Sequence, residues 1–397
     1  MLVYMDSSDF SDLAARRSES RVADVYDKLI AYRDSGQVTF VFSAVHVTEV
    51  APTNPDAAPY SSGRSDMISE ICGRNALISM DRLVDEEIVR LASRADNPVE
   101  ACSNEGQWYP EVKDIISPVL LAETVAEELE VAISKEQLNR SDRRALKKRL
   151  IRKGSPTKEL RMLLASNSKA ANLESMLESY PMRPADAKVL NEFIVGRATR
   201  IQAEKAFLNS LKDVSFMMRW FEQHYQTMSP ITEWLRGPAQ KFIASMVEVS
   251  DSIRELKALQ NEAGIQIPDS PLTQEGWKKM QDQHLARFVE ARLRRDGNSV
   301  DSSTVREVDR YCPGIAMFVR TLHSAMWTLT QDKPRNPKVS DFADAVHAIY
   351  LPYVDVFRAD KFMSTFLRDR ARKYNAEVVS KLVDLPKVID AKLAANH

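Results

Sequence analysis

Short apolar runs that end abruptly in polar residues constrain the fold of this chain more than any other feature. Met1 to Met5 are apolar or aromatic and Asp6 follows them, as in a buried strand that leads into a helix. Val38 to Phe42 are β-branched or aromatic throughout and predict a second buried strand. Arg21 to Arg33, between the two, carries apolar residues at helical spacing. The opening therefore predicts an alternation of strands and helices.

The end of the chain returns to the same alternation. Asp341 to Tyr350 predicts a helix, and Val354 to Arg358 predicts a strand. Phe362 to Tyr374 predicts another helix, and a weaker apolar run at Val378 and Val379 is a candidate for the last strand. We expect the two ends of the chain to share one parallel sheet.

The middle of the chain has a different character, with long charged and apolar stretches of helical period and few strand-like runs. We expect an α/β fold with a central parallel sheet, interrupted by a large all-α insertion. The predicted division is residues 1–96 for the N-terminal part of the α/β domain, 97–300 for the helical insertion and 301–397 for the C-terminal part. Breaks such as Ser229-Pro230 and Gly237-Pro238 predict several helices within the insertion.

Composition excludes several classes of protein. The formal net charge is −1, so affinity for nucleic acid would have to come from a local basic cluster. Cys72, Cys102 and Cys312 are odd in number and scattered, which argues against a disulfide framework and against a structural zinc site. No apolar run reaches membrane-spanning length, and acidic residues appear before a secretory signal could form. We expect a soluble cytoplasmic protein with no membrane partner.

Acidic residues stand where a parallel sheet places its ligands. Asp6 and Asp360 each follow a predicted strand, and Glu49 lies on the short helix after the second strand. Asp341 and Asp344 are one helical turn apart. Carboxylates that converge repel one another unless a cation compensates them, so such a cluster favours Mg²⁺ or Mn²⁺ and the hydrolysis of phosphodiester bonds.

Each of these carboxylates also has a structural explanation. Asp6 could cap a helix, Glu49 could be a solvated surface residue, and Asp341 could be an acidic residue favoured at a helix N-terminus. His46 and His347 could act as general bases, but a histidine on the apolar side of a helix is more often a hydrogen-bonded packing residue. Spacing alone leaves the metal site and the structural explanation open.

The segments that carry these residues resemble the PIN-like nuclease family. Residues 341–361 contain Asp341-x-x-Asp344-x-x-His347, then an apolar helix and strand, then Asp360 followed by Lys361, which is similar to the family's last motifs. The start of the chain, a strand ending in Asp6 and a hydroxyl residue, is similar to its first motif. Ser43-x-x-His46-x-x-Glu49 is similar to its second. The resemblance covers the first and last 95 or so residues and says nothing about the middle.

The resemblance implies an α/β/α sandwich and a role for each matching residue. It implies that one set of residues is both catalytic and metal-holding, namely Asp6, Glu49, Asp344 and Asp360, with Asp341 as a further ligand. It also implies accessory roles for Ser7, Ser8, His347 and Lys361, in which a serine would orient Asp6 or a water beside the metal. The sequence departs from the pattern at Ala359, where many members carry Thr or Ser, and in the length of the insertion.

A basic stripe within the insertion is a candidate phosphate-binding face. On one helix, a basic residue at every fourth position would form a ridge made of Arg140, Arg144, Lys148 and Arg152. The glutamates between Glu123 and Glu136 could instead pair with the ridge in a helical hairpin, and this alternative is slightly favoured.

These observations predict an Mg²⁺- or Mn²⁺-dependent endonuclease. RNA is favoured over DNA as the substrate because many proteins with this resemblance cut RNA. Two alternatives stay open, a non-catalytic scaffold that binds partners through the insertion, and a structure-specific DNA nuclease. The insertion is also a candidate surface for homo-oligomer formation or for a regulatory protein.

Overall fold

The chain forms two compact units in a computed structural model. Unit 1 comprises Met1–Val50, Met67–Pro110 and Trp234–His397, and unit 2 comprises Ala51–Asp66 and Glu111–Glu233. The structure describes residues 1–109, 139–152, 155–157, 181–194, 197–264, 272–297, 307–331 and 338–395. The domain boundaries expected at 96/97 and 300/301 stay predictions.

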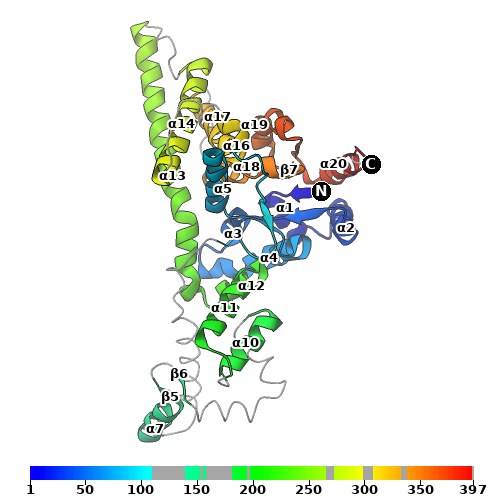
Figure 1. The fold of residues 1–397 in the computed structure, drawn as a ribbon, viewed down its shortest axis with the longest axis vertical. Helices are drawn as coiled ribbons and strands as arrows, with labels where there is room; N and C mark the ends of the chain where they lie inside the picture. Colours follow the sequence, from blue (N-terminus) through cyan, green and yellow to red (C-terminus); the bar gives the residue numbers. More distant parts are fainter. Residues whose placement is uncertain are drawn as a thin grey trace. The chain divides into compact units, whose positions relative to one another are not determined.

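Unit 1 is built around a four-stranded parallel sheet with the strand order β2-β1-β7-β8 (Figure 1). The strands are β1 (Leu2–Tyr4), β2 (Thr39–Val41), β7 (Val356–Arg358) and β8 (Glu377–Val379). In β1, Val3 lies opposite Phe40 of β2 on one side and Val356 of β7 on the other. The prediction that both ends of the chain share one parallel sheet is therefore confirmed.

A short strand pair extends the sheet beyond β2. β3 (Ala76–Leu77) joins at a single parallel bridge between Phe42 and Ala76, and it pairs in antiparallel fashion with β4 (Cys102–Ser103). The Leu77 amide donates to the Phe42 carbonyl at 2.7 Å. The described part of unit 1 is thus α/β, as the sequence predicts.

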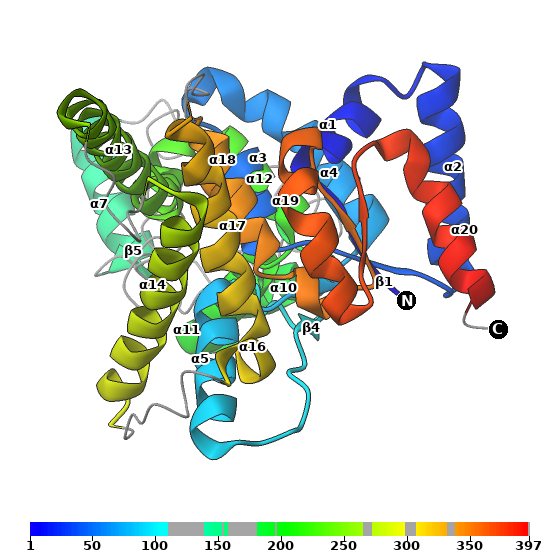
Figure 2. The same cartoon turned by 90° about the horizontal axis from the view of Figure 1, so that it is seen from above.

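Helices lie on both faces of the sheet. α20 (Leu385–Ala395) packs against β7, β8 and α2 (Ser20–Asp34), whereas α17 (Pro313–Leu329) packs against α18 (Val339–Ala348) and α19 (Lys361–Ala371). Figure 2 shows α2 and α20 on one side of β1 and α17, α18 and α19 on the other. The helices whose residues all fall in unit 1 are α1 (Ser7–Ala15), α2 (Ser20–Asp34), α3 (Ala44–Val50), α5 (Met80–Ser93), α14 (Gln274–Arg295), α16 (Val308–Tyr311), α17 (Pro313–Leu329), α18 (Val339–Ala348), α19 (Lys361–Ala371) and α20 (Leu385–Ala395). Single 3₁₀ turns occur at Leu351–Tyr353, Arg372–Tyr374 and Leu382–Asp384.

The core of unit 1 is centred on β1. Tyr4 and Val41 are 0% exposed, and the ring of Tyr4 stacks on that of Phe357 with centroids 5.1 Å apart. A strand covered by helices on both faces buries successive side chains, which explains the unbroken apolar runs in the sequence. Each large apolar side chain buried here contributes about 1.5–3 kcal/mol.

Unit 2 is helical in its described part apart from one short hairpin. α10 (Pro184–Ile194) packs closely on α11 (Arg200–Leu211), and the buried Asp186 accepts a hydrogen bond from Ser210 Oγ at 2.9 Å. The hairpin of β5 (Ile151–Arg152) and β6 (Ser155–Pro156) follows α7 directly. The remaining elements of this unit are α7 (Arg140–Leu150), α10 (Pro184–Ile194), α11 (Arg200–Leu211), α12 (Val214–Gln223) and a 3₁₀ turn at Pro55–Ala57.

Two helices contribute residues to both units. They are α4 (Ala58–Cys72) and α13 (Tyr225–Ala263). The breaks expected at Ser229-Pro230 and Gly237-Pro238 do not occur, because both pairs lie inside α13. A proline inside a helix removes one backbone hydrogen bond and destabilises the helix by about 3 kcal/mol. This helix of 39 residues continues through both prolines despite that loss. No helix among the described residues combines the length and apolar character needed to cross a membrane.

Candidate functional site

Two carboxylates lie at the carboxyl ends of neighbouring strands. Asp6 follows β1 and caps α1, and its Oδ1 accepts hydrogen bonds from the Ser8 amide at 2.8 Å and the Ser8 hydroxyl at 2.6 Å. Asp360 follows β7 and caps α19, and its Oδ1 accepts from the Met363 amide at 2.6 Å. Because β1 and β7 are paired, residues from opposite ends of the chain reach the same edge of the sheet.

Asp344, on α18, is the residue around which the acidic side chains gather. Burial raises its pKa to about 9, and the charges of four further carboxylates raise it as well, those of Asp6, Glu49, Asp360 and Asp341. No described residue donates a hydrogen bond to the Asp344 carboxylate. The predicted acidic residues therefore interact electrostatically around one carboxyl group that has no hydrogen-bonded or cationic partner in the described chain.

Glu49, on α3, is held by two hydrogen bonds to the same oxygen. The hydroxyl of Ser7 donates to Glu49 Oε2, and His347 Nε2 lies 3.0 Å from that atom. Burial alone would raise the pKa of Glu49, but the hydrogen bonds from His347 and Ser7 outweigh it and lower the pKa below its ordinary value. Glu49 is therefore ionised at neutral pH, unlike Asp344.

A chain of buried polar groups extends from Glu49 into the core. The hydroxyl of Tyr4 lies 2.5 Å from His347 Nδ1 and 2.6 Å from the hydroxyl of Ser43. Burial raises the pKa of Tyr4 well above its ordinary value, so the phenol keeps its proton. The consistent assignment is that Tyr4 donates to His347 Nδ1 and that His347 Nε2–H donates to Glu49. Neither the spacing of the residues nor the family resemblance predicted a role for Tyr4.

His46 has the structural role that the sequence favoured. Its side chain is 0% exposed, its Nδ1 accepts from the Ser43 amide at 3.0 Å, and its Nε2 donates to the Met5 carbonyl at 2.8 Å. Burial lowers the pKa of His46 to about 3. His46 therefore stays neutral and holds the end of β1 in place.

A buried ion pair stands beside the cluster. Asp9, in the first turn of α1, is 1% exposed and lies 3.0 Å from Arg358 Nη2 at the end of β7. Its other oxygen accepts from the Asp6 amide at 3.1 Å. Burial raises the pKa of Asp9 to about 7, and the charge of Arg358 opposes that shift. This pair fixes the backbone of Asp6 and was not identified from the sequence.

The donor set fits a hard divalent cation in its chemistry. Glu49 and Asp360 each use one carboxylate oxygen for hydrogen bonds, and no described residue donates to the other. Carboxylate oxygens are the ligands that Mg²⁺ and Mn²⁺ prefer. Among the described residues, however, no three His, Cys, Asp or Glu side chains lie close enough to form a ready-made metal site. A cation would have to draw these carboxylates closer together.

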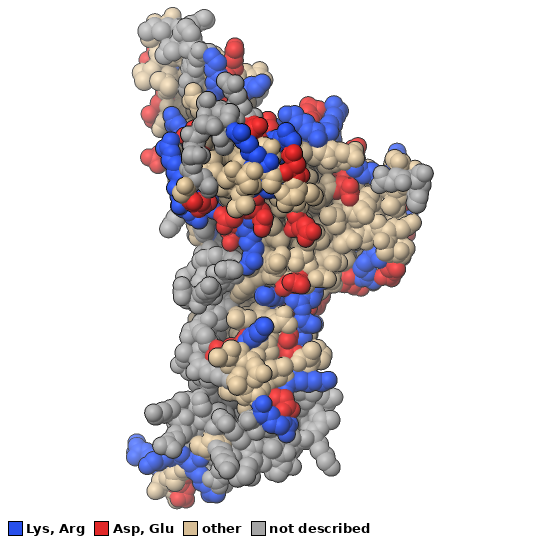
Figure 3. All heavy atoms as spheres, in the orientation of Figure 1, with Lys and Arg blue, Asp and Glu red and all other residues tan. Residues whose placement is uncertain are grey.

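The remaining predicted residues are Asp341, Lys361 and the basic residues of α7. Asp341 caps the start of α18 through the Lys338 amide at 2.8 Å, and Lys361 is the exposed first residue of α19. On α7, Arg140, Arg144 and Lys148 are exposed, and Figure 3 shows basic side chains gathered over this helix.

The predicted ridge is shorter than expected. The helix ends at Leu150 because the chain turns into the β5–β6 hairpin, so Arg152 lies on β5 and leaves the ridge. The glutamates from 123 to 136, proposed as an alternative partner of the ridge, lie outside the described residues.

Comparison with known proteins leaves the family open. No family model, no curated protein and no solved structure matches this chain. The assignment to the PIN-like nucleases therefore stays a prediction that rests on the motifs of the sequence.

Proposed function

We propose that this protein is an Mg²⁺- or Mn²⁺-dependent nuclease with a PIN-like α/β/α domain. The observation that carries the proposal is the electrostatic convergence on Asp344 of the acidic residues that follow β1 and β7 and that lie on α3 and α18. Such an accumulation of negative charge is unfavourable unless a ligand cation compensates it. The proposed ligands are Asp6, Glu49, Asp344 and Asp360, with Asp341 beside them.

The chemistry would be divided between the cation and the chain. A bound divalent cation supplies activation of water and stabilisation of the negative charge that develops on phosphate oxygens. Asp344 would release its proton when the cation binds, since positive charge lowers the pKa of a nearby carboxyl group. Glu49 is ionised already, so it could bind a cation without losing a proton.

The hydrogen bonds around the cluster support the orientation that such a site requires. Ser8 fixes Asp6, while Ser7 and His347 fix Glu49. His347 is in turn held by Tyr4 in the buried core. Partners of this kind set the direction of a ligand oxygen, and their loss commonly costs 10- to 100-fold in affinity or activity in metal sites.

The substrate that we propose is RNA in preference to DNA, on the resemblance alone. The exposed basic residues Arg140, Arg144 and Lys148 of unit 2 would supply sequence-independent contacts to phosphates. A scaffold without catalytic activity is the second candidate, and it is favoured by the lack of a preformed three-residue metal site among the described residues.

The test is a cleavage assay with labelled single-stranded RNA, single-stranded DNA and branched DNA in Mn²⁺, Mg²⁺ and EDTA. The wild-type chain is compared with Asp344→Asn and with Asp369→Asn, which changes an exposed aspartate of α19 away from the cluster. We expect cleavage that EDTA abolishes, that Asp344→Asn loses and that Asp369→Asn keeps.

Three other outcomes of this assay would each favour a different interpretation of the protein. Cleavage that survives in Asp344→Asn would place the active site at other residues. Preference for branched DNA over single-stranded RNA would make the protein a structure-specific DNA nuclease. Absence of cleavage on every substrate, together with absence of Mn²⁺ binding, would favour the scaffold.

A further inference from the structure

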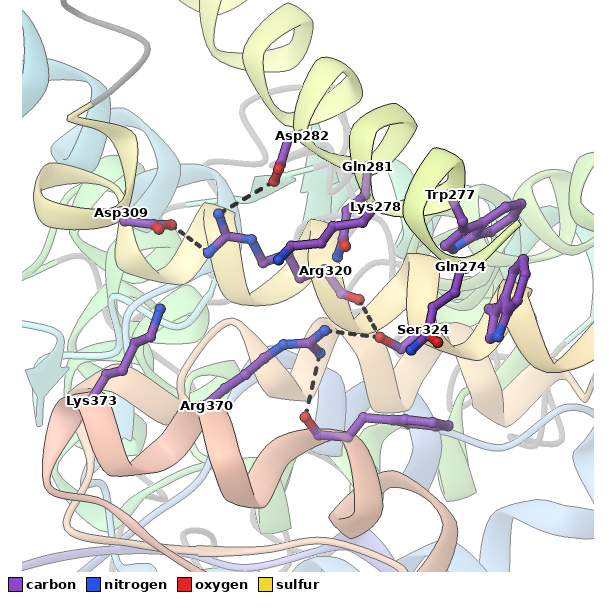
Figure 4. A pocket seen from close by; sticks show the side chains of 12 residues that line it. Gln274, Trp277, Lys278, Gln281, Asp282, Asp309, Arg320, Ser324, Arg370 and Lys373 are labelled. Atoms are coloured by element: carbon purple, nitrogen blue, oxygen red, sulfur yellow. Dashed lines mark hydrogen bonds and ion pairs between the residues drawn. The ribbon is translucent and has the colours of Figure 1, made fainter. Parts of the chain in front are cut away.

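A cavity of unit 1 lies among α14, α17 and α19, and none of the residues of the acidic cluster lines it (Figure 4). Its volume is about 580 Å³, which is within the range of pockets that enclose small ligands. Asp360, at the start of α19, belongs to the acidic cluster, whereas Arg370 and Lys373 line the cavity. Ten residues of helix separate Asp360 from Arg370, a rise of about 15 Å, so the two places are distinct.

The cavity wall carries excess positive charge. Lys278, Arg320, Arg370 and Lys373 line it, against the two carboxylates of Asp282 and Asp309. Both carboxylates are engaged by Arg320, with Asp309 at 2.5 Å and Asp282 at 3.6 Å. Arg320 is therefore compensated within the protein, whereas no carboxylate of the described residues forms an ion pair with Lys278, Arg370 or Lys373.

Arg370 is the best placed of these three cations. It donates to Ser324 Oγ at 3.0 Å and to the Phe366 carbonyl at 3.4 Å, and both acceptors are neutral. Burial and the nearby charge of Arg320 lower its pKa below the ordinary value for arginine. No carboxylate of the described residues forms an ion pair with it. A partly buried guanidinium in this position is stabilised by an anion, and phosphate matches its geometry.

The opposite end of the cavity is aromatic. Trp277 and Trp327 line it with ring centroids 5.3 Å apart, and Trp277 is fixed by a hydrogen bond from its indole nitrogen to the His323 carbonyl at 3.0 Å. Figure 4 shows Trp277 at one end and Arg320 and Lys373 at the other.

Gln281 lies on the wall of the cavity and is 8% exposed, and its Nε2 has no hydrogen-bond partner among the described residues. A buried amide without a partner is costly and indicates a missing acceptor.

We propose that this cavity binds a free nucleoside phosphate. The phosphates contact Arg370 with Lys278 and Lys373 beside it, the base packs against Trp277 and Trp327, and a polar atom of the ligand accepts from Gln281. Charge at one end and flat aromatic surface at the other match a molecule that joins a phosphate to a planar ring.

The test is a calorimetric titration of the full-length protein in EDTA with ATP, GTP, CTP, UTP and AMP. Inorganic phosphate, adenosine and a short single-stranded oligonucleotide are titrated as probes of the separate parts. We expect at least one nucleotide to bind more tightly than both phosphate and its nucleoside, with quenching of tryptophan fluorescence. Because EDTA removes divalent cations, binding here is independent of the proposed nuclease site.

Variants locate the site. Arg370→Gln should weaken nucleotide binding by about tenfold or more, since it removes a charge-assisted hydrogen bond to a phosphate. Lys278→Gln combined with Lys373→Gln changes only exposed side chains, so it tests the cavity even if Arg370→Gln does not fold. The matched control is Arg368→Gln, which removes an exposed arginine of the same helix that does not line the cavity.

Three outcomes would overturn the proposal. The first is the absence of binding by any nucleotide. The second is binding of inorganic phosphate as tightly as nucleotides, which would show that Trp277 and Trp327 do not contribute to binding. The third is binding of the oligonucleotide but of no free nucleotide, which would make the cavity part of a nucleic-acid surface. Retained binding in Asp344→Asn would support a site separate from the acidic cluster.

Discussion

Asp9 and Asp344 are two acidic residues of unit 1 that differ in what opposes their charge. Asp9 is 1% exposed but lies 3.0 Å from Arg358, and its pKa rises to about 7. Asp344 forms no ion pair with a described residue, and burial and the charges of four other carboxylates raise its pKa to about 9. The fold itself therefore compensates the charge of Asp9 with Arg358, whereas the described residues do not compensate the charge of Asp344.

The same contrast occurs with the opposite sign in the cavity beside α19. Arg320 is paired with Asp309 and Asp282, whereas Arg370 contacts neutral acceptors. A charge that the fold compensates explains stability, and a charge that it leaves uncompensated indicates a ligand.

The largest expected effect is on cleavage. Asp344→Asn should lower the rate of metal-dependent cleavage by on the order of 10³-fold, because it removes a ligand from the proposed cation site. Asp9→Asn should change the rate by less than about tenfold per folded molecule, since Asp9 is paired with Arg358 and is not a proposed ligand. Initial rates at saturating Mn²⁺ measure both variants. Equal losses of cleavage rate in Asp344→Asn and Asp9→Asn would contradict the different roles assigned to the two residues.

The second effect is on stability. Arg358→Met should lower the free energy of unfolding by about 3 kcal/mol, because it leaves Asp9 buried without its cation. Arg368→Met, on the exposed face of α19, should change it by less than about 0.5 kcal/mol. Urea unfolding followed by circular dichroism gives both values. An Arg358→Met variant as stable as wild type would show that the ion pair is not needed.

The third effect has the opposite sign and depends on pH. The folded-state pKa of Asp344 is about 9, against about 3.9 in an unfolded chain. The folded state therefore keeps a proton that the unfolded state releases, and raising the pH from about 4 towards 9 lowers the stability of the metal-free protein. Asp344→Asn should remove this loss and be more stable at pH 8 in EDTA by on the order of 2 kcal/mol.

The measurement is urea unfolding of wild type and Asp344→Asn at pH 5 and pH 8 in EDTA. The difference between the two proteins should grow with pH. A constant difference, or a variant that is less stable at pH 8, would show that Asp344 is not held in an unfavourable environment.

The smallest effect concerns unit 2. Replacing Arg140, Arg144 and Lys148 together by Gln should weaken binding of nucleic acid by about three- to tenfold near 0.1 M salt and reduce the salt dependence. Filter binding at several salt concentrations, with the catalytically silent Asp344→Asn background, separates affinity from cleavage. Adding Arg152→Gln should have little further effect, since Arg152 is not on the helix. Unchanged affinity in the triple variant would contradict a role for α7.

Local patterns in the sequence predicted the sheet well. The apolar runs before Asp6, at Val38 to Phe42 and before Asp360 correspond to β1, β2 and β7, and the weak run at Val378 corresponds to β8. These strands are buried on both faces, so their composition alone identifies them. The positions of the acidic residues at strand ends followed directly from those strands.

Contacts between distant residues could not be predicted in the same way. The hydrogen bonds that join Tyr4 to His347 and the ion pair of Asp9 with Arg358 connect opposite ends of the chain. No spacing rule links residues so far apart, because tertiary packing brings them together. The passage of α13 through Pro230 and Pro238 was missed for a related reason, since helix propensity is only a weak guide against a long helical context.

A calorimetric titration of the metal-free protein with Mn²⁺ at neutral pH, for wild type and for Asp344→Asn, tests the proposed cation site. We predict that Mn²⁺ binds the wild-type protein, that protons are released on binding, and that Asp344→Asn loses the binding. Proton release is expected because Asp344, with a pKa of about 9, must ionise to accept a cation. Absence of Mn²⁺ binding to the wild type, or equal binding to both proteins, would contradict the assignment of this cluster as a cation site.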